Sequence, residues 1–305
     1  MTRRASFWLG VALLLLAALS WSTAGLFPKL VSTDMFTTLF WRSLLGGLTV
    51  LVLRLVLDRR PAAGGLWRLS PPEWALSVIT AIAMLTFVAA FYYTTVADVV
   101  FIYGAFPIIT LVLSAWLLHT GIQRVDVVCA ASVALGVALI LQGQPSLHNA
   151  LGSILSFVAV VMFALETVGI KRYPQADMVK VTYTGALLAA LVVLPFASFS
   201  HASGRDLAWL WLYGFLNIGV GFGLFLLGVQ RVKAVLAALI CMVEIPLAPL
   251  WAYALFGEVV TQQSLIGGAV ILVAVLANLA WTGVFRQPDP AVAVTAPAAP
   301  RPRPP

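Results

Sequence analysis

Residues 74–118 read WALSVITAIAMLTFVAAFYYTTVADVVFIYGAFPIITLVLSAWLL, an almost continuous apolar stretch of 45 residues. One helical crossing of a bilayer uses about 20 residues, so the stretch is too long for a single span. It lacks the strict alternation of barrel strands and exceeds their length of about 10 residues. We therefore expect two membrane-spanning helices, Trp74–Ala97 and Val99–Leu118, joined by a tight hairpin near Asp98.

The composition extends this expectation to the whole chain. Of its 305 residues, 62% are hydrophobic and only 10% are charged, and the mean hydropathy is +1.02. Soluble proteins carry about 25% charged residues, so the composition excludes a soluble globule. The sequence predicts an all-α integral membrane protein that is surrounded by a lipid bilayer.

Ten apolar runs are long enough to cross a membrane and are separated by short polar gaps. Ten spans of about 20 residues leave about 100 residues for loops and tails, which agrees with the length of the chain. The expected spans are Ser6–Pro28, Met35–Val56, Trp74–Ala97, Val99–Leu118, Asp126–Gly143, Ala150–Lys171, Met178–Phe199, Ala208–Gln230, Ala234–Phe256 and Ser264–Phe285.

The basic residues indicate how these spans are oriented. With a cytoplasmic N-terminus, fifteen Lys and Arg residues fall on the inside, whereas only Lys29 and Arg205 fall outside and Arg42 lies within a span. Cytoplasmic loops carry such an excess of basic residues. We expect a multi-pass protein of a bacterial inner (plasma) membrane with both termini in the cytoplasm.

Several other classes of protein are excluded by their missing signatures. The formal charge of +7 does not indicate nucleic-acid binding, because the basic residues are not gathered on one face among aromatics. Cys129 and Cys241 lie in apolar runs without a CxxC or His partner, so neither a disulfide nor a metal site is expected. The motifs HExxH, GxxxxGK[ST] and GxSxG are absent. The sequence therefore predicts no enzyme, no cofactor and no direct use of ATP.

The two ends of the chain need separate interpretation. Arg3 and Arg4 precede an apolar run, as in a secretory signal, but the apolar character continues through Phe27 and we expect the segment to be retained. Residues 287–305 contain seven prolines. We expect this segment to be a disordered cytoplasmic tail.

An internal repeat relates residues 1–145 to residues 146–286. Matching residues occur at shifts of 139 and 142 positions, and each half contains five expected spans. An odd number of crossings makes the second half enter from the opposite side, which gives the inverted repeat of many secondary transporters. The matching pairs are Pro107 with Pro246, His119 with Glu258, Gln123 with Gln262, Gly10 with Gly152, Trp21 with Phe163, and Lys29 with Lys171.

Three stretches carry a family resemblance: Ser20–Thr23 followed by Lys29, Phe40–Arg42, and above all Glu244–Glu258, which reads EIPLAPLWAYALFGE. In these residues the chain resembles the drug/metabolite transporter superfamily, in its ten-helix EamA-like branch. Many relatives place the proline directly after the first Glu, whereas Ile245 intervenes here. The resemblance implies export or exchange of small metabolites such as amino acids.

Away from the span ends, three charged residues lie inside expected spans, where a charge costs about 2.5–3.5 kcal/mol at the helix centre: Arg42, Glu166 and Glu244. Glu244 is close to the expected midplane, Arg42 is nearer the outside, and Glu166 is nearer the cytoplasm. We interpret Glu244 as a protonatable or cation-binding carboxylate, Arg42 as a partner for a substrate carboxylate, and Glu166 as a second coupling residue. The alternative is structural: the charges pair to hold helices together, and Glu166 reaches Lys171 or water.

Uncharged candidates complete the expected binding site. Trp21 and Phe163 occupy equivalent positions of the two halves, and we expect them to line opposite walls of one central cavity. Tyr103 and Asn217 supply a hydroxyl and an amide within the membrane. The alternative for all four is helix packing or hydrogen bonding between helices.

Two prolines and four polar residues complete the set. Pro107 and Pro246 are related by the repeat, and we interpret them as hinges because proline permits a helix to bend. The residues expected at span ends, in reach of water and without a function, are Glu73, Asp98, His119 and Glu258.

The sequence thus predicts a secondary transporter that exports a small organic metabolite, such as an amino acid, by alternating access. A proton-coupled exporter of cationic drugs is the alternative within transport. A membrane-embedded enzyme or a lipid-handling protein is the alternative from another class.

Overall fold

A computed structural model describes residues 3–57, 65–119, 124–143, 146–199, 202–229, 231 and 240–281. Within these ranges the chain forms helices and no β-strand. The helices are α1 Arg3–Ser22, α2 Phe27–Leu30, α3 Met35–Leu57, α4 Pro71–Tyr93, α5 Val96–Tyr103, α6 Phe106–Leu117, α7 Arg124–Gln142, α8 Leu147–Arg172, α9 Met178–Val193, η1 Leu194–Phe196, α10 Gly204–Gly214, the π-helix η3 Phe215–Gly221, α11 Phe222–Val229, α13 Glu244–Phe256 and α14 Gln262–Trp281.

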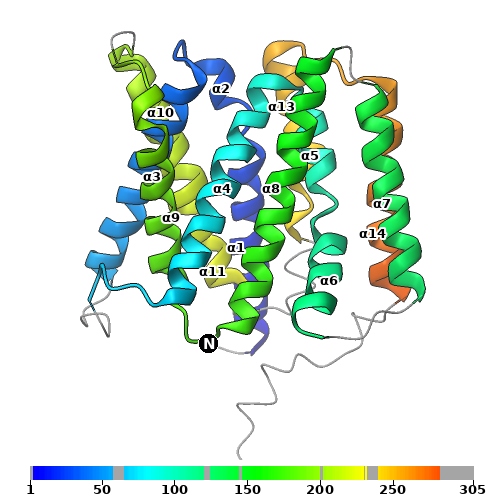
Figure 1. The fold of residues 1–305 in the computed structure, drawn as a ribbon, viewed down its shortest axis with the longest axis horizontal. Helices are drawn as coiled ribbons and strands as arrows, with labels where there is room; N and C mark the ends of the chain where they lie inside the picture. The colour runs from blue at the N-terminus through cyan, green and yellow to red at the C-terminus, as the bar shows by residue number, and fades with distance from the viewer. Residues whose placement is uncertain are drawn as a thin grey trace, which may run out of the picture.

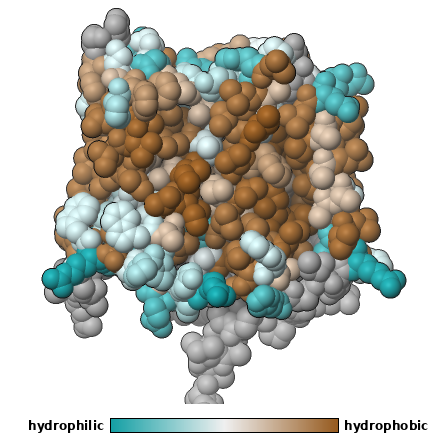
Figure 2. Space-filling model, viewed as in Figure 1, coloured by the Kyte–Doolittle hydropathy of each residue, from teal (hydrophilic) through white to brown (hydrophobic). Residues whose placement is uncertain are grey.

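The long helices lie roughly parallel, and α1 begins at the bottom of Figure 1. We call this side the N-terminal end and the opposite side, which carries α2, the α2 end. Because α14 runs from the α2 end to the N-terminal end, the described chain starts and finishes on the same side (Figure 1). Hydrophobic residues cover the middle of the visible face, and hydrophilic residues gather toward its two ends (Figure 2). This surface suits a protein that crosses a bilayer.

Seven helical segments are long and apolar enough to cross a membrane, and they coincide with the second to eighth expected spans. The first and tenth expected spans contain the shorter apolar helices Ser6–Ser22 and Gln262–Ala277. The ninth, Ala234–Phe256, begins outside the described residues, and its described part contains α13. The Pro-rich segment 287–305 also lies outside the described residues.

Two expected boundaries are displaced for local reasons. The first span ends at Ser22 rather than Pro28, and Pro28 instead lies in the first turn of the short helix α2, where its missing N–H removes no hydrogen bond. The hairpin turns at Thr94 and Thr95 rather than at Asp98. Thr95 is the N-cap of α5, and its hydroxyl accepts a hydrogen bond from the Asp98 backbone N–H at 3.1 Å.

Two residues expected in water are buried, which corrects the prediction for them. Asp98 is 1% exposed, and its carboxylate accepts hydrogen bonds from Thr94 Oγ1 at 2.9 Å, Thr95 Oγ1 at 2.7 Å and Ser264 Oγ. It is covered because α14 begins beside the start of α5. Glu73 is also buried, in a polar network that is described below.

Both prolines that we interpret as hinges lie just beyond a helix break. The fourth span is interrupted at Gly104 and Ala105, and Pro107 is the second residue of α6. In the second half a turn at residues 242–243 precedes α13, whose third residue is Pro246. The breaks therefore occur at corresponding places of the two halves.

The first helix of each half packs against helices of the other half. The first-half helix α1 packs against η3, α11 and α13 of the second half, whereas the second-half helix α8 packs against α4, α5 and α6 of the first. Helices at corresponding positions also pair, α3 with α9 and α7 with α14. Interchanging the two halves converts each of these contacts into another, as an inverted repeat requires.

The same relation appears where α3 and α9 begin. Asp34 accepts a hydrogen bond from the backbone N–H of Thr37 at 3.0 Å, and Asp177 accepts one from that of Lys180 at 3.2 Å. These carboxylates satisfy backbone donors that have no partner within the helix. Asp34 caps α3 at the α2 end, and Asp177 caps α9 at the N-terminal end.

Capping boxes start α4 and α10 in the same way. Ser70 and Glu73 form the box at the N-terminal end, and Ser203 and Asp206 form it at the α2 end. In both boxes a serine hydroxyl and an acid three residues later satisfy each other's backbone N–H groups. Each end of the molecule therefore carries one box and one Asp cap.

Candidate functional site

An aromatic group occupies the region where the fourth span is broken. Tyr103, the last residue of α5, stacks on Phe106 with ring centroids 5.8 Å apart and meets Phe163 of α8 edge-on at 5.8 Å. Phe87 of α4 contacts both Tyr103, at 5.7 Å, and Phe163, at 6.2 Å. Each aromatic pair of this kind contributes about 0.5–1.5 kcal/mol beyond its burial. The rings form a wall built from three segments, α4, α8 and the broken fourth span.

Two carboxylates lie near this wall. Tyr103 is within electrostatic range of both Glu244 and Glu166. Glu166 lies one helical turn beyond Phe163 and faces the Thr80 hydroxyl, although that hydroxyl makes no hydrogen bond of standard geometry. No basic side chain pairs with either carboxylate among the described residues.

Glu244 is the first residue of α13, directly after the break in the ninth span. Its residue surface is partly exposed. Helix α13 has 13 residues, which puts Glu244 about 20 Å from the α2 end at 1.5 Å per residue. That Glu244 lies close to the midplane of a membrane stays a prediction.

Trp21 and Asn217 join α1 to the π-helix η3. The Trp21 indole N–H donates to the Asn217 carbonyl at 3.0 Å, and the Asn217 amide donates to the Ser20 carbonyl at 3.3 Å. A third bond runs from Ser20 Oγ to the Leu216 carbonyl at 2.7 Å. The wide turns of a π-helix leave carbonyls available to such donors. The polar groups of Trp21 and Asn217 are thus used in packing two helices, the alternative that the sequence left open.

Arg42 lies apart from the aromatic wall, in the half of α3 nearer the α2 end. It is 5% exposed, and its guanidinium lies 4.7 Å from the centroid of the Tyr213 ring. Helix α10 brings Tyr213 to this position because Gly214 packs directly on α3, where a Cβ would come within 2.7 Å of the Arg42 carbonyl oxygen. Among the residues that the structure describes, Arg42 Nε and Nη1 have no hydrogen-bond partner.

The energies show that the Arg42 environment is incomplete. A desolvated cation–π contact contributes about 2 kcal/mol. Burying a charged group costs several kcal/mol, so the contact with Tyr213 does not offset it. No described carboxylate forms an ion pair with Arg42. The guanidinium is therefore a charge without its counter-charge.

One apolar cluster closes the α2 end and connects the two halves of the chain. We call it the apolar seal, and its rings include Phe27 stacked on Tyr213 at 4.6 Å. Elsewhere the buried apolar side chains form separate clusters, one among α3, α4, α9 and η3, one among α5, α6, α7, α8 and α14, and one around Leu14 of α1. The seal consists of Ala24, Phe27, Leu39, Val88, Ala90, Phe91, Val96, Val99, Val100, Val193, Tyr213, Ala248 and Ala252.

Polar contacts between the halves reinforce the seal. Lys29 forms an ion pair with Glu258, whose other oxygen accepts a hydrogen bond from the Val96 backbone N–H at 2.6 Å. Asp206 accepts hydrogen bonds from the backbone N–H of Ser32 at 2.9 Å and from its hydroxyl at 2.8 Å. Glu258, which we expected to lie free in water, thus links α2, α5 and the end of α13.

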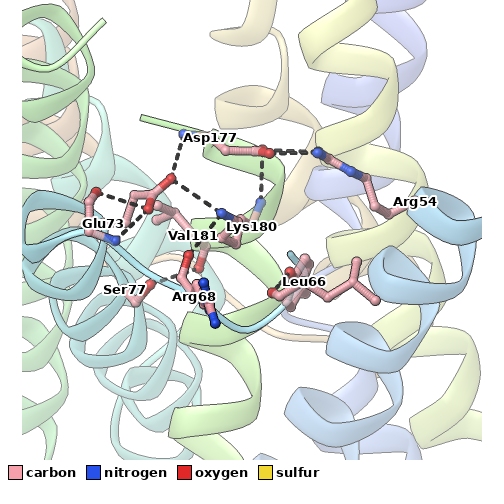
Figure 3. A network of polar contacts seen from close by, with 10 residues as sticks. Arg54, Leu66, Arg68, Glu73, Ser77, Asp177, Lys180 and Val181 are labelled. Carbon is pink, nitrogen blue, oxygen red and sulfur yellow. Dashed lines mark hydrogen bonds and ion pairs between the residues drawn. The ribbon is translucent and has the colours of Figure 1, made fainter. Parts of the chain in front are cut away.

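A charged network joins the halves at the N-terminal end (Figure 3). Arg54 of α3 donates to both oxygens of Asp177, at 3.0 and 2.6 Å. Lys180 Nζ lies 3.8 Å from Glu73 Oε1 and donates to the Arg68 carbonyl at 3.1 Å, while Glu73 also accepts from the Asp177 backbone N–H at 3.0 Å. This network connects α3, α4 and α9 and does not include the broken helices.

One family of proteins matches the chain twice. The EamA-like transporter family matches residues 8–142 and again residues 150–280. The chain belongs to the EamA-like transporter family. An uncharacterized transporter of Archaeoglobus fulgidus is 29% identical over 276 residues, which cover 89% of this chain and 96% of that protein. One solved crystal structure is similar with a TM-score of 0.64 at 16% identity, over 92% of this chain and 99% of that one, which shows the likeness of fold alone.

Within this EamA-like transporter, the expected site residues form three groups instead of one. Tyr103 and Phe163 are in contact, with Glu166 and Glu244 nearby, while Arg42 is separate. Trp21 and Asn217 form a third group, and Trp21 packs against Phe222 and Phe225 at 5.5 and 5.4 Å rather than facing Phe163. Whether any of them touches a transported solute stays a prediction.

Sequence reasoning missed the residues that complete these groups. Tyr213, under Arg42, lies four residues before Asn217 and therefore on the same face of its helix. That spacing was a usable signal, because two polar side chains on one face of an apolar span indicate an internal surface. Phe87 and Phe106 carried no such signal, since aromatic residues are frequent throughout the chain.

Proposed function

We propose that this EamA-like protein is a ten-span secondary transporter of the bacterial inner membrane that exports a small organic metabolite, such as an amino acid, by alternating access. Both termini lie in the cytoplasm in this proposal, so the N-terminal end is cytoplasmic. The family, the exchanged helix packing and the excess of basic residues in the expected cytoplasmic gaps support it.

A single observation supports the proposal: an apolar seal joins the halves at the α2 end, while Glu244, which is partly exposed, lies about 20 Å from that end at the start of α13. A transporter that exposes one site to either side needs one closed end at a time. The broken spans begin α6 and α13 next to the aromatic wall, where a bend would move the walls of the site. In this proposal the conformation is closed to the outside, and Pro107 and Pro246 act as the hinges.

The chemistry of the centre favours a solute with an apolar body. Tyr103, Phe163 and their aromatic neighbours supply flat apolar surface. Glu244 and Glu166 supply negative charge or, when protonated, hydrogen-bond donors. A zwitterionic metabolite fits both kinds of surface, with its ammonium group near a carboxylate. In this proposal Glu244 is the coupling residue, because protonation of its carboxylate removes a charge from the centre.

A proton-coupled exporter of cationic drugs is the second candidate, favoured by two carboxylates beside four aromatic rings. Aromatic faces and acids together attract organic cations. The uncompensated charge of Arg42 opposes it, because a guanidinium repels cations. The two candidates differ in the solute carried, so one flux experiment separates them.

The test is flux through purified protein in liposomes, with labelled amino acids, carboxylic acids, sugars and organic cations supplied with and without a pH gradient. We expect pH-driven flux of at least one small metabolite and its loss in Glu244→Gln, which keeps the shape of the side chain but cannot ionise. Glu258→Gln is the matched control: it removes a carboxylate at the α2 end, and although loss of the ion pair with Lys29 can change the rate of flux, the flux is expected to stay dependent on the pH gradient. Undiminished pH-driven flux in Glu244→Gln would remove the coupling role, and flux of cations alone would favour the drug exporter.

A further inference from the structure

Arg42 differs from three other basic side chains in having no acid beside it among the described residues. Lys29, Arg54 and Lys180 pair with Glu258, Asp177 and Glu73, respectively. Arg42 is 5% exposed and is the eighth of the 23 residues of α3, away from both helix ends, and an arginine side chain stays charged in proteins. Its Nε and Nη1 have no acceptor within the described residues. Two charged donors are therefore available beneath the apolar seal.

Tyr213 adds another available donor at the same place. Its residue surface is fully buried, and its hydroxyl faces the Arg42 guanidinium but makes no hydrogen bond of standard geometry with the described residues, so its O–H is free to donate. Buried serine and threonine hydroxyls can bond to a carbonyl of their own helix, but a tyrosine hydroxyl lies too far from its backbone to do so. The unused hydroxyl and the guanidinium belong to side chains in direct contact.

These donors define the class of ligand that they suit. A planar guanidinium fork matches the two oxygens of a carboxylate, and a tyrosine hydroxyl can donate a further hydrogen bond. One cation balances one negative charge, so a carboxylate suits the position better than a phosphate dianion. The apolar side chains around Tyr213 in the seal also favour a carboxylate, whose pair with Arg42 has no net charge, over a dianion, whose pair keeps a negative charge.

We propose that Arg42 and Tyr213 form a subsite that binds a carboxylate group of the transported solute. The proposal rests on the proposed transport function and deepens it by naming the class of substrate as a carboxylate-bearing metabolite. Tyr213 belongs to the apolar seal through its stacking on Phe27, so a bound carboxylate lies against the elements that must separate for release at the α2 end. The subsite therefore holds the solute during its passage to the outside.

Matched solutes that differ only in this group provide the test. L-leucine, L-phenylalanine and 4-methylpentanoate are compared with their amides, in thermal-shift binding to the purified protein and in liposome flux. Wild-type protein is expected to bind at least one acid about tenfold more tightly than its amide, because charge-assisted hydrogen bonds are lost with the amide. Arg42→Gln is expected to abolish that preference, and Arg42→Lys to keep part of it. Arg205→Gln, which removes an exposed charge from α10, is expected to keep it fully.

The outcomes separate this inference from the proposed function. Flux of any solute with no preference for acids, or a preference that persists in Arg42→Gln, overturns the subsite and leaves the transport proposal standing. No flux of any solute in the broader panel overturns the transport proposal itself. If Arg42→Gln does not fold, the wild-type comparison of acid with amide and the Arg42→Lys variant still decide.

Discussion

The two ends of the molecule use the same helix caps but different charges. At the N-terminal end, Lys180 and Arg54 surround the capping acids Glu73 and Asp177. At the α2 end, position 37, which lies 143 residues before Lys180, is Thr37, and it exchanges hydrogen bonds with the Ser198 backbone at 2.9 and 3.2 Å. Both side chains tie a helix start to a loop of the other half.

The difference teaches that the repeat preserves backbone geometry and leaves charge free to vary. A carboxylate at a helix N-terminus satisfies orphan N–H groups on either side of a membrane. Lys and Arg are more frequent in cytoplasmic loops than in loops on the other side of the membrane. The end with Lys180 and Arg54 is therefore the one that our proposal places in the cytoplasm.

The largest expected contrast between the ends is in stability. Glu73→Ala leaves Lys180 covered without its acid, and we expect a loss of about 2–3 kcal/mol, below the 3–5 kcal/mol of a deep ion pair because the site lies at the edge of the bundle. Asp206→Ala removes a capping acid that forms no ion pair among the described residues but accepts two hydrogen bonds from Ser32, so we expect about 1–2 kcal/mol. Thermal midpoints in detergent measure both. Equal losses would show that the charges at the two ends are equivalent, and Glu73→Gln separates loss of charge from loss of shape.

A smaller contrast concerns which ion pair controls the conformation. Cys241 lies beside the ninth-span break and is partly exposed, while Cys129 is buried. We expect Glu258→Gln to lower alkylation of Cys241 from the cytoplasmic side about two- to threefold, because an exposed ion pair contributes about 0.2–1 kcal/mol to the outward-closed state. Labelling of inside-out vesicles with an impermeant maleimide measures this.

The control for that experiment is at the other end. Arg54→Gln breaks a pair that joins α3 to α9, so it should change stability without changing Cys241 labelling. A fall in labelling of the same size in both variants would contradict a specific role for the Lys29–Glu258 pair.

The smallest expected effect is the loss of stability at low pH, which should be similar for the capping aspartates at the two ends. Burial favours neutral Asp177, but hydrogen bonds from Arg54 and the Lys180 backbone outweigh it and lower the pKa of Asp177; local hydrogen bonds likewise lower the pKa of Asp34. A lowered folded-state pKa stabilises the protein above the ordinary Asp value of about 3.9, and this contribution is lost as the pH falls through the folded-state pKa. Asp177→Asn should therefore lower the thermal midpoint at pH 7 and approach wild type as the pH falls through the lowered pKa of Asp177. If the thermal midpoint of Asp177→Asn stays below that of wild type by the same amount at every pH, the effect comes from packing and not from the charge of Asp177.

Much of the fold was predictable because lipid imposes simple rules. Seven expected spans were found as membrane-length helices, since about 20 apolar residues and internally satisfied backbone groups are required. Boundaries were less predictable. Thr95 and Ser22 decide where helices start and stop through local hydrogen bonds, which hydropathy does not register.

The candidate site was predictable in its charges and not in its grouping. Arg42, Glu166 and Glu244 stand out because charge is rare in hydrocarbon. The neighbours of these residues depend on which helices are in contact. Helices α1 and α8 each pack against the other half of the chain, and the order of the helices in the sequence does not predict this. Asp98 was misjudged for the same reason: the hydroxyl of Ser264, 166 residues away, covers it.

The bonds between α1 and η3 also bear on how the protein is made. Ser20 and its acceptor Leu216 are 196 residues apart, so at 5–20 residues per second a ribosome needs about 10–40 s to supply the partner. During that time the first helix waits in lipid with its serine and tryptophan donors unmatched. The first helix therefore completes its hydrogen bonds only after the second half has been translated. In a chain truncated before Leu216, these donors would stay unpaired within the membrane.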